Sequence, residues 1–204
     1  MISKSLLVKL QAEDPQLAIF LGELLHEVEL AQVEVKRQNE LIDKLYKGLD
    51  HPTCRIYGAT QSIPNSAWTT IVFTSERWDT HDMFDTSKST VRIVVPFDGM
   101  YLLGGQIQFA GSSTGGRFVR LLVNGATEIG MQSLLESGLA YDVRLIVVSL
   151  ASLTAGSYVE LQVWQNSGAA LNINSFLEQS PEFWATRVAD PVILSLYEQS
   201  LGDK

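Results

Sequence analysis

An almost entirely apolar seam runs through residues 17–49 of this chain. Its members alternate spacings of four and three residues, which is the a and d pattern of a heptad repeat. They are Leu17, Leu21, Leu24, Val28, Ala31, Val35, Gln38, Ile42, Leu45 and Leu49. A helix with such a seam buries it by winding around other helices, so the pattern predicts a coiled-coil stalk over residues 14–50.

Both ends of this segment carry helix boundary signals. Asp14 can cap the first turn, and Pro15 is harmless there because its missing N–H has no partner in a helix anyway. Gly48 and Pro52 are typical of a helix end. The alternative is a long amphipathic helix folded back on its own domain, but a period of about 3.5 residues favours the coiled coil.

The number of helices in the stalk is the next question. Val28, Val35 and Ile42 at a positions, with leucine at d positions, would favour a dimer by rule. Four flanking residues, however, widen the apolar stripe beyond what one partner covers: Phe20, Leu25, Leu41 and Tyr46. Gln38 is the one polar member of the seam and fits a register device. We therefore expect a homotrimer.

Composition limits the possible functions. The chain has 204 residues, of which 46% are hydrophobic and 19% charged, so it can build a packed core. A net charge of −8 argues against duplex nucleic acid as a partner. Cys54 is the single cysteine, and no apolar run approaches a membrane span. The N-terminal residues lack the apolar core of a secretory signal, which predicts synthesis in the cytoplasm and no membrane insertion.

Residues 54–189 change to short β-rich runs separated by turn residues. Asn124-Gly125 is a hairpin signal between two of these runs. Many short strands at this spacing predict a mainly β fold, a jelly-roll sandwich of ten strands. The expected strands are 55–60, 68–74, 90–96, 100–109, 117–124, 127–131, 141–150, 157–165, 170–176 and 182–188.

Several of these strands are apolar on both faces. One face can be served by Val91, Ile93, Val95, Tyr101, Leu103, Ile107 and Phe109, and by Val143, Leu145 and Val147. The opposite face carries Val94, Met100, Leu102, Ile146, Val148 and Leu150. Each large apolar side chain left in water forgoes about 1.5–3 kcal/mol. The second face is therefore expected to meet another subunit.

The order of motifs over residues 55–188 resembles the trimeric jelly rolls of tumour necrosis factor and of the globular heads of complement component one, subunit q. The motifs are TIVFTSERWDT, MFDTSKSTVRIVVPFDGMYLLGGQIQF, VRLLVNGATEI, LTAGSYVELQVWQNSG and EFWATRV. The resemblance implies a ten-stranded Greek-key head that trimerises through apolar strand faces and carries an N-terminal stalk.

Two features depart from this family. Vertebrate members are exported, whereas this N-terminus shows no export signal, and residues 190–204 continue past the last strand as a short helical tail. A stalked trimer made in the cytoplasm is similar to phage virion proteins such as head fibres, decorations and tail adhesins. Residues 1–13 would then anchor it to a capsid or tail protein, with the alternative that this end is merely frayed.

Catalytic motifs are missing from the sequence. No serine lies in a nucleophile elbow, no paired metal-binding motif occurs, and the three histidines are scattered, so we expect no enzyme and no cofactor. Cys54 fits a small buried hydrophobe, and Trp164 and Trp184 fit the core. An acidic loop holds the candidate ligand contacts Trp78, Asp79, His81, Asp82 and Asp85. Calcium at Asp79, Asp82 and Asp85 is a weaker alternative to simple solvation.

These features predict a non-enzymatic, homotrimeric protein on the surface of a phage virion. Its head would attach to a host-surface glycan or protein through loops 76–88, 111–116 and 165–169, since sandwich loops carry function. Three linked weak sites would gain avidity. The alternatives are a purely structural cement for the capsid or tail and a carbohydrate-active enzyme with an unusual site.

Overall fold

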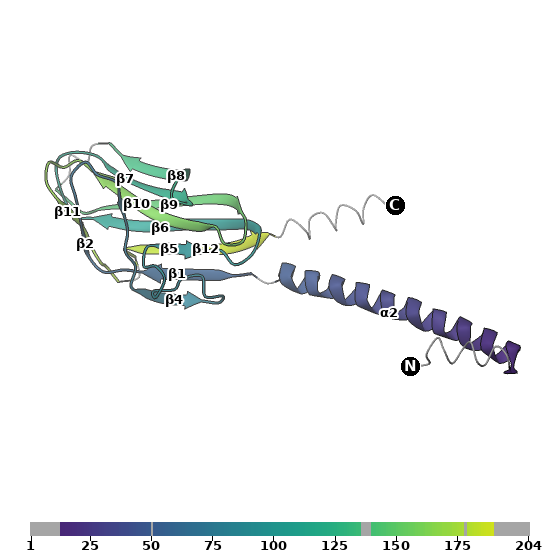
Figure 1. Cartoon of the computed structure of the whole chain (residues 1–204). Coiled ribbons are helices and arrows are strands. Elements are labelled where there is room, and N and C mark those ends of the chain that lie inside the picture. The colour runs from purple at the N-terminus through teal and green to yellow at the C-terminus, as the bar shows by residue number, and fades with distance from the viewer. Residues whose placement is uncertain (1–12, 50, 136–139, 178, 190–204) are drawn as a thin grey trace. The chain divides into compact units, whose positions relative to one another are not determined.

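The computed structural model describes residues 13–49, 51–135, 140–177 and 179–189. The chain divides into two compact units, Met1–Leu49 and Asp50–Lys204, and each is described here by itself. The first unit contains one long helix and the second contains the strands (Figure 1). The anchor expected at residues 1–13 and the tail expected at 190–204 fall, apart from Glu13, outside the described residues.

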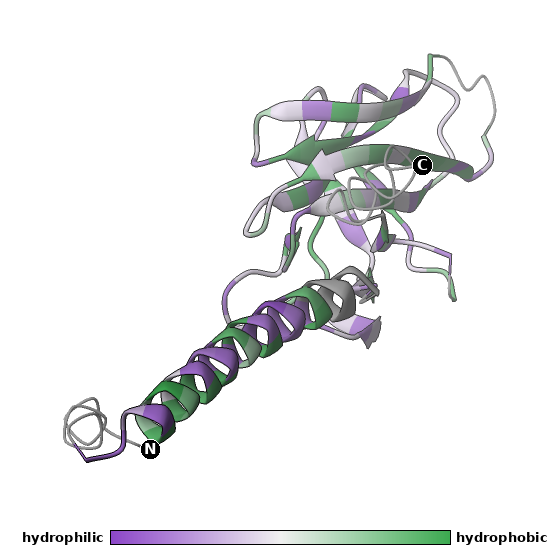
Figure 2. Ribbon diagram, turned by 90° about the vertical axis from the view of Figure 1, so that its right-hand side faces the viewer, coloured by the Kyte–Doolittle hydropathy of each residue, from purple (hydrophilic) through white to green (hydrophobic). Residues whose placement is uncertain are grey.

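The helix α2 spans Pro15–Leu49 and confirms the helix expected over residues 14–50. Asp14 caps it as expected, because its Oδ1 accepts a hydrogen bond of 3.1 Å from the backbone N–H of Leu17. Figure 2 shows hydrophobic and hydrophilic patches alternating along the helix. The helix is long enough, at 35 residues, to be roughly 50 Å in length.

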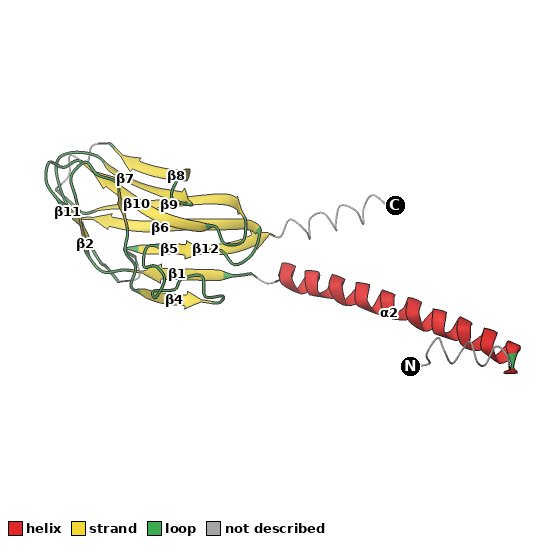
Figure 3. Cartoon of the chain, in the orientation of Figure 1, coloured by secondary structure: helices red, strands yellow, loops and turns green. Residues whose placement is uncertain are grey.

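Twelve strands form the second unit within the described residues (Figure 3). They are β1 (Thr53–Tyr57), β2 (Gln61–Ile63), β3 (Thr69–Thr70), β4 (Ser75–Asp79), β5 (Arg92–Val94), β6 (Gly99–Phe109), β7 (Arg117–Val123), β8 (Thr127–Leu134), β9 (Val143–Leu153), β10 (Tyr158–Gln165), β11 (Leu171–Ile173) and β12 (Glu182–Ala189). The expected number of ten is therefore wrong.

The two strands that the sequence did not predict are β2 and β4. Strand β2 has three residues, too few to show alternation. Strand β4 reads SERWD, a charged run of low strand propensity. It lies at the end of its sheet and is held there by pairing with β1. Charged residues are common at such edges because they discourage pairing with other chains.

The strands form two antiparallel sheets. In the first sheet, which we call sheet A, β9, β6, β12, β1 and β4 lie side by side, and β11 and β2 continue beside the end of β6. In the second, sheet B, the order is β8, β7, β10, with β3 and β5 both pairing with the far edge of β10. The turn between β7 and β8 has positive φ angles at Asn124 (52°) and Gly125 (68°), as expected of the Asn-Gly hairpin.

The core lies between the two sheets. Sheet A contributes Ile56, Tyr101, Leu103, Ile107, Phe109 and Phe183, and sheet B contributes Ile93, Val119, Leu121, Val159, Leu161 and Val163, all fully buried. The expected inward face of the two-faced strands is confirmed at Ile93, Val95, Tyr101, Leu103, Ile107 and Phe109, and at Leu145 and Val147. Alternation then forces the opposite side chains of β6 and β9 outward.

Candidate interaction surfaces

The seam of α2 is exposed to solvent in the single chain. Leu17, Leu24, Val28, Val35 and Ile42 each expose between 42% and 56% of their surface. Nothing in the helix itself covers these side chains, and burying them against other helices would remove them from water. The exposed seam is what a coiled coil requires, and the coiled coil itself stays a prediction. The side chains of Leu45 and Leu49 lie outside the described part of the helix.

A second unpartnered apolar surface lies on the outward side of sheet A. It consists of Met100 and Leu102 on β6 and of Ile146, Val148 and Leu150 on β9, and we call it the apolar face. Val148 is 54% and Leu150 60% exposed, although both lie in the middle of a long strand. Clustered apolar exposure of this kind marks an interaction surface. Val94 is not part of it, because β5 belongs to sheet B.

Pairing across sheet A extends the apolar face into an aromatic row. Val148 lies opposite Gly104, Gly104 opposite Trp184, Trp184 opposite Arg55, and Arg55 opposite Trp78. The guanidinium of Arg55 lies 5.7 Å from the ring centre of Trp78 and 5.9 Å from that of Trp184. These distances place one cation between two indoles.

A depression of about 340 Å³ lies on this row, lined by Arg55, Trp78, Gln106, Trp184 and Thr186. Arg55 is held by the carboxylate of Glu182, 1% exposed, which accepts hydrogen bonds of 2.8 Å from Arg55 Nε and from Arg77 Nη2. The two arginines come from β1 and β4, so the buried carboxylate ties three strands together.

The structure places Trp78 and Asp79 differently from the sequence prediction. Both were expected in a polar contact loop, and both lie on strand β4. The indole of Trp78 is on the outward side of sheet A beside Arg55, and its Nε1 donates to Thr53 Oγ1 at 3.3 Å. Trp184, expected in the core, is half-buried on the same side. The charged residues next to Trp78 favoured a loop in the sequence prediction. The sequence therefore did not indicate that Trp78 and Trp184 lie on the same side of sheet A.

The three aspartates considered for calcium do not converge. Oδ1 and Oδ2 of Asp79 accept the backbone N–H groups of His81 (3.0 Å) and Phe84 (2.7 Å). Asp85 pairs with Lys88 at 2.8 Å, and this hydrogen bond is the main reason why the pKa of Asp85 falls to about 2. Within the described residues no three potential metal-ligating side chains of His, Cys, Asp or Glu lie together.

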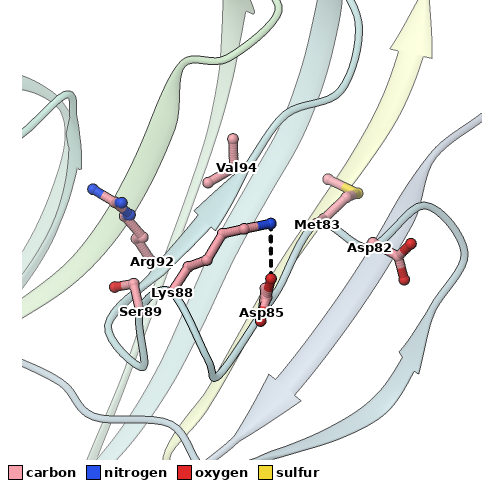
Figure 4. A pocket seen from close by; sticks show the side chains of 7 residues that line it. All are labelled: Asp82, Met83, Asp85, Lys88, Ser89, Arg92 and Val94. Atoms are coloured by element: carbon pink, nitrogen blue, oxygen red, sulfur yellow. Dashed lines mark ion pairs between the residues drawn. The ribbon is translucent and has the colours of Figure 1, made fainter.

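Asp82 and Asp85 nevertheless border one pocket of about 140 Å³ (Figure 4). Its lining residues are Asp82, Met83, Asp85, Lys88, Ser89, Arg92 and Val94. In the close-up the side chain of Asp82 lies apart from the Asp85–Lys88 ion pair. Two acidic and two basic side chains line the pocket, so it has no strong preference for ions of either sign.

The three loops expected to contact a ligand lie in two places. Loops 111–116 and 165–169 meet, because Gly116 N donates to Asn166 Oδ1 at 2.6 Å and Thr114 Oγ1 donates to Ser167 O at 2.9 Å. The acidic loop lies elsewhere: the ring centre of His81 is 5.6 Å from that of Phe97, a residue just before the start of β6. Strand β6 is eleven residues long, which separates its two ends by roughly 35 Å.

Sequence reasoning missed an aromatic cluster on the outward side of sheet B. Trp68, Phe118 and Trp164 line a depression of about 300 Å³, and we call these three side chains the aromatic site. Trp164, expected in the core, is half-buried there. A signal was present: Val119, Leu121, Leu161 and Val163 face the core, so alternation turns Phe118 and Trp164 outward.

Cys54 is fully buried on β1, as expected of a structural thiol. Burial, and next the nearby carboxylate of Asp79, raise the pKa of Cys54 far above its usual value. The thiolate is the reactive form of cysteine, so this thiol is expected to be unreactive in the folded protein.

Comparison with known proteins gives a fold and nothing finer. No family model matches the chain, and no curated relative matches it. Among solved structures it is similar to murine APRIL at pH 5.0, with a TM-score of 0.53 and 11% identity over 68% of this chain and 100% of that chain. Structures of murine APRIL at pH 8.0 and 8.5 match the same shares at 13% identity, with TM-scores of 0.48 and 0.46. The first likeness supports the expected tumour-necrosis-factor-like jelly roll in the head.

Proposed function

We propose that this protein is a non-enzymatic homotrimer on the surface of a phage virion, where its jelly-roll head attaches to a host surface. The single observation that carries the proposal is the apolar face of sheet A. It leaves Ile146, Val148 and Leu150 in water on β9, a strand that is paired with β6 along its whole length. Full burial of a large apolar side chain contributes about 1.5–3 kcal/mol, and these three are about half-exposed, so covering them favours a partner surface.

A second copy of the chain is the partner that best fits both units. The seam of α2 makes its own demand for identical helices, and a closed ring of three chains would serve both surfaces with one symmetry. Trimerisation through apolar strand faces is also what the resemblance to tumour necrosis factor implies. No helix in the described part of the chain is long and apolar enough to cross a membrane.

A trimer supports attachment through avidity. A trimer presents three copies of every surface that is not buried between subunits, and the second and third contacts form at a high effective concentration. Weak sites on the head are sufficient for adhesion under these conditions. The same trimer without any host contact would act as a structural cement, so the two roles differ in what the outward surfaces bind.

Light scattering on the full chain tests the trimer. We expect a mass of three chains, and we expect it to fall when Val148→Glu and Leu150→Glu are combined with Leu24→Asp and Val28→Asp. Met131→Glu is the matched control on sheet B, since Met131 is 50% exposed and lies away from the apolar face. A monomeric wild-type chain at micromolar concentration would overturn the proposal.

Labelled protein on purified phage particles and on host cells tests the location and the role. Signal on both particles and cells supports attachment. Signal on particles alone replaces attachment by the cement role, and signal on neither contradicts the virion location.

A further inference from the structure

We propose that the aromatic site of sheet B is a saccharide-binding site. The inference rests on the proposed function, because it names the surface of the head and the class of ligand through which attachment would occur. The site lies on the outward side of sheet B, so it stays free when the outward side of sheet A is covered by other subunits. A trimer would therefore display it three times.

The three rings form one contiguous cluster. Phe118 lies at its centre. The centre of its ring is 5.1 Å from the ring centre of Trp164 and 6.5 Å from that of Trp68. It is nearly perpendicular to both, at 81° and 71°. These edge-to-face contacts hold the rings in place, because the positive edge of one ring meets the negative face of another. Trp68 remains 39% exposed.

Arg120 adds a rigid cation next to the rings. Its guanidinium carbon lies 3.8 Å from the ring centre of Trp68. Gln162 Oε1 accepts hydrogen bonds from Arg120 Nε and Nη2, and Glu128 accepts one from Nη1. Gln162 is itself fixed by donating to Thr70 Oγ1 at 3.1 Å. The site is thus held in one arrangement before any ligand arrives, which lowers the entropic cost of binding.

Hydrogen-bonding groups remain available at the rim. Within the described residues neither the indole N–H of Trp68 nor that of Trp164 has an acceptor, and the hydroxyl of Ser133 beside Phe118 has no side-chain partner. A sugar ring matches this combination. Its C–H groups form an apolar face that can lie on an aromatic ring, and its hydroxyls at the ring edge can both donate and accept.

Other ligand classes fit less well. The next row across sheet B carries Thr70, Gln162 and Arg120 before it reaches Met131, so the apolar area ends after one row of rings. A standard protein interface needs about 800 Å² on each partner, which this cluster does not offer. The net charge of −8 disfavours nucleic acid, although bases also stack on aromatic rings. The volume of about 300 Å³ is at the lower end for small-ligand sites and suits one or two sugar units.

The test uses the full-length protein and four soluble probes: maltohexaose, cellohexaose, chitohexaose and the polysaccharide released from a Gram-negative lipopolysaccharide. Binding is followed by tryptophan fluorescence and by saturation-transfer NMR up to 10 mM sugar. The variants are Trp68→Ala and Trp164→Ala. The control is Phe176→Ala, because Phe176 is also an exposed aromatic residue with an arginine, Arg144, 5.9 Å from its ring.

We expect saturable binding of at least one probe and a loss of at least tenfold in affinity in both tryptophan variants. The control should bind like the wild type, and all variants should keep the wild-type mass and circular dichroism. If one tryptophan variant fails to fold, the other and Arg120→Ala decide, the latter with an expected loss of several-fold.

Two results would overturn the inference. Equal binding by the wild type and the tryptophan variants would move the saccharide site elsewhere on the head and leave attachment intact. An absence of binding to all four probes would refute the proposal that the ligand is a saccharide. Neither result changes the expected trimer mass or the expected labelling of particles. A failure of the saccharide proposal can therefore be distinguished from a failure of the proposed function.

Discussion

The indole of Trp184 on β12 lies directly over Gly104 on β6, in the outward row of sheet A. A Cβ atom on Gly104 would come within 2.3 Å of the ring. The next residue, Gly105, has the same relationship with the other side of the sheet, where a Cβ atom would come within 2.5 Å of Leu161 in the core. Two successive glycines thus make room for one large side chain on each face.

The two glycines predict different consequences for the same substitution. Gly105→Ala should lower the free energy of unfolding by about 1–3 kcal/mol, because Leu161 is enclosed and cannot move aside. Gly104→Ala should cost less stability, since Trp184 can swing toward solvent, but should weaken self-association by disturbing the outward row. Denaturant unfolding and sedimentation at several concentrations measure the two effects. An equal loss of stability in both variants would contradict the different mobility of the two neighbours.

The stalk predicts a position-dependent response to charge. Leu24→Asp with Val28→Asp should yield species of lower mass in light scattering, because both residues belong to the seam. Leu30→Asp with Val33→Asp changes the same residue types at outer heptad positions, where Val33 is 67% exposed, and should leave the mass unchanged. Identical behaviour of the two pairs would show that the heptad seam has no special role.

The buried carboxylate of Glu182 predicts a large effect of a small change. Glu182→Gln removes the charge that receives Arg55 and Arg77 and should destabilise the head by about 1.5–3 kcal/mol. Glu128→Gln is the matched control, since its ion pair with Arg120 is longer, at 3.3 Å, and 40% exposed on the carboxylate side. Surface pairs of that kind contribute at most about 1 kcal/mol. Chemical denaturation of both variants measures the two losses of stability. A loss in Glu128→Gln as large as that in Glu182→Gln would contradict the prediction.

Cys54 predicts slow chemistry. Because the thiol is buried and its pKa is raised, Ellman's reagent should react with the native protein far more slowly than with protein in guanidinium chloride. The chain has one cysteine, so all of the released colour reports this thiol. Rapid labelling of the native protein would be inconsistent with the packing of β1.

Asp142 predicts a contribution to acid sensitivity. Its carboxylate accepts hydrogen bonds from Gln108 Nε2 (2.8 Å), Asn174 Nδ2 (3.1 Å) and Gly111 N (3.0 Å), and the bond from Gln108 is the main cause of its lowered pKa. A lowered pKa in the folded state means that the stabilisation is present above the unfolded value, about 3.9, and is lost as the pH falls through the folded value.

Asp142→Asn should therefore destabilise the protein at pH 7 and narrow its difference from the wild type at pH 2–3. The expected effect is modest, because Asp142 is exposed and solvent weakens its interactions. Urea unfolding midpoints at the two pH values measure it. A constant difference between variant and wild type at both pH values would argue against a titrating role.

Much of the architecture could be predicted from local pattern. The α2 helix was placed to within one residue at each end, because Asp14, Pro15 and Gly48 act over a few positions. Strands β6, β7, β10 and β12 were placed closely for the same reason, since alternation is a property of the strand itself. Strand β4 was not predicted, because residues distant in sequence stabilise it. It pairs with β1, and its Arg77 contacts Glu182.

The sequence by itself determined that the chain has a long helix with one apolar seam, a β-rich head, and strands with too much apolar surface for one core. Periodicity decides these features, because it sets which way each side chain points relative to its own backbone. Only the tertiary structure decided which outward side chains become neighbours. Arg55 meets Trp78 and Trp184, and Phe118 meets Trp68 and Trp164, because sheet topology brings together strands that are far apart along the chain.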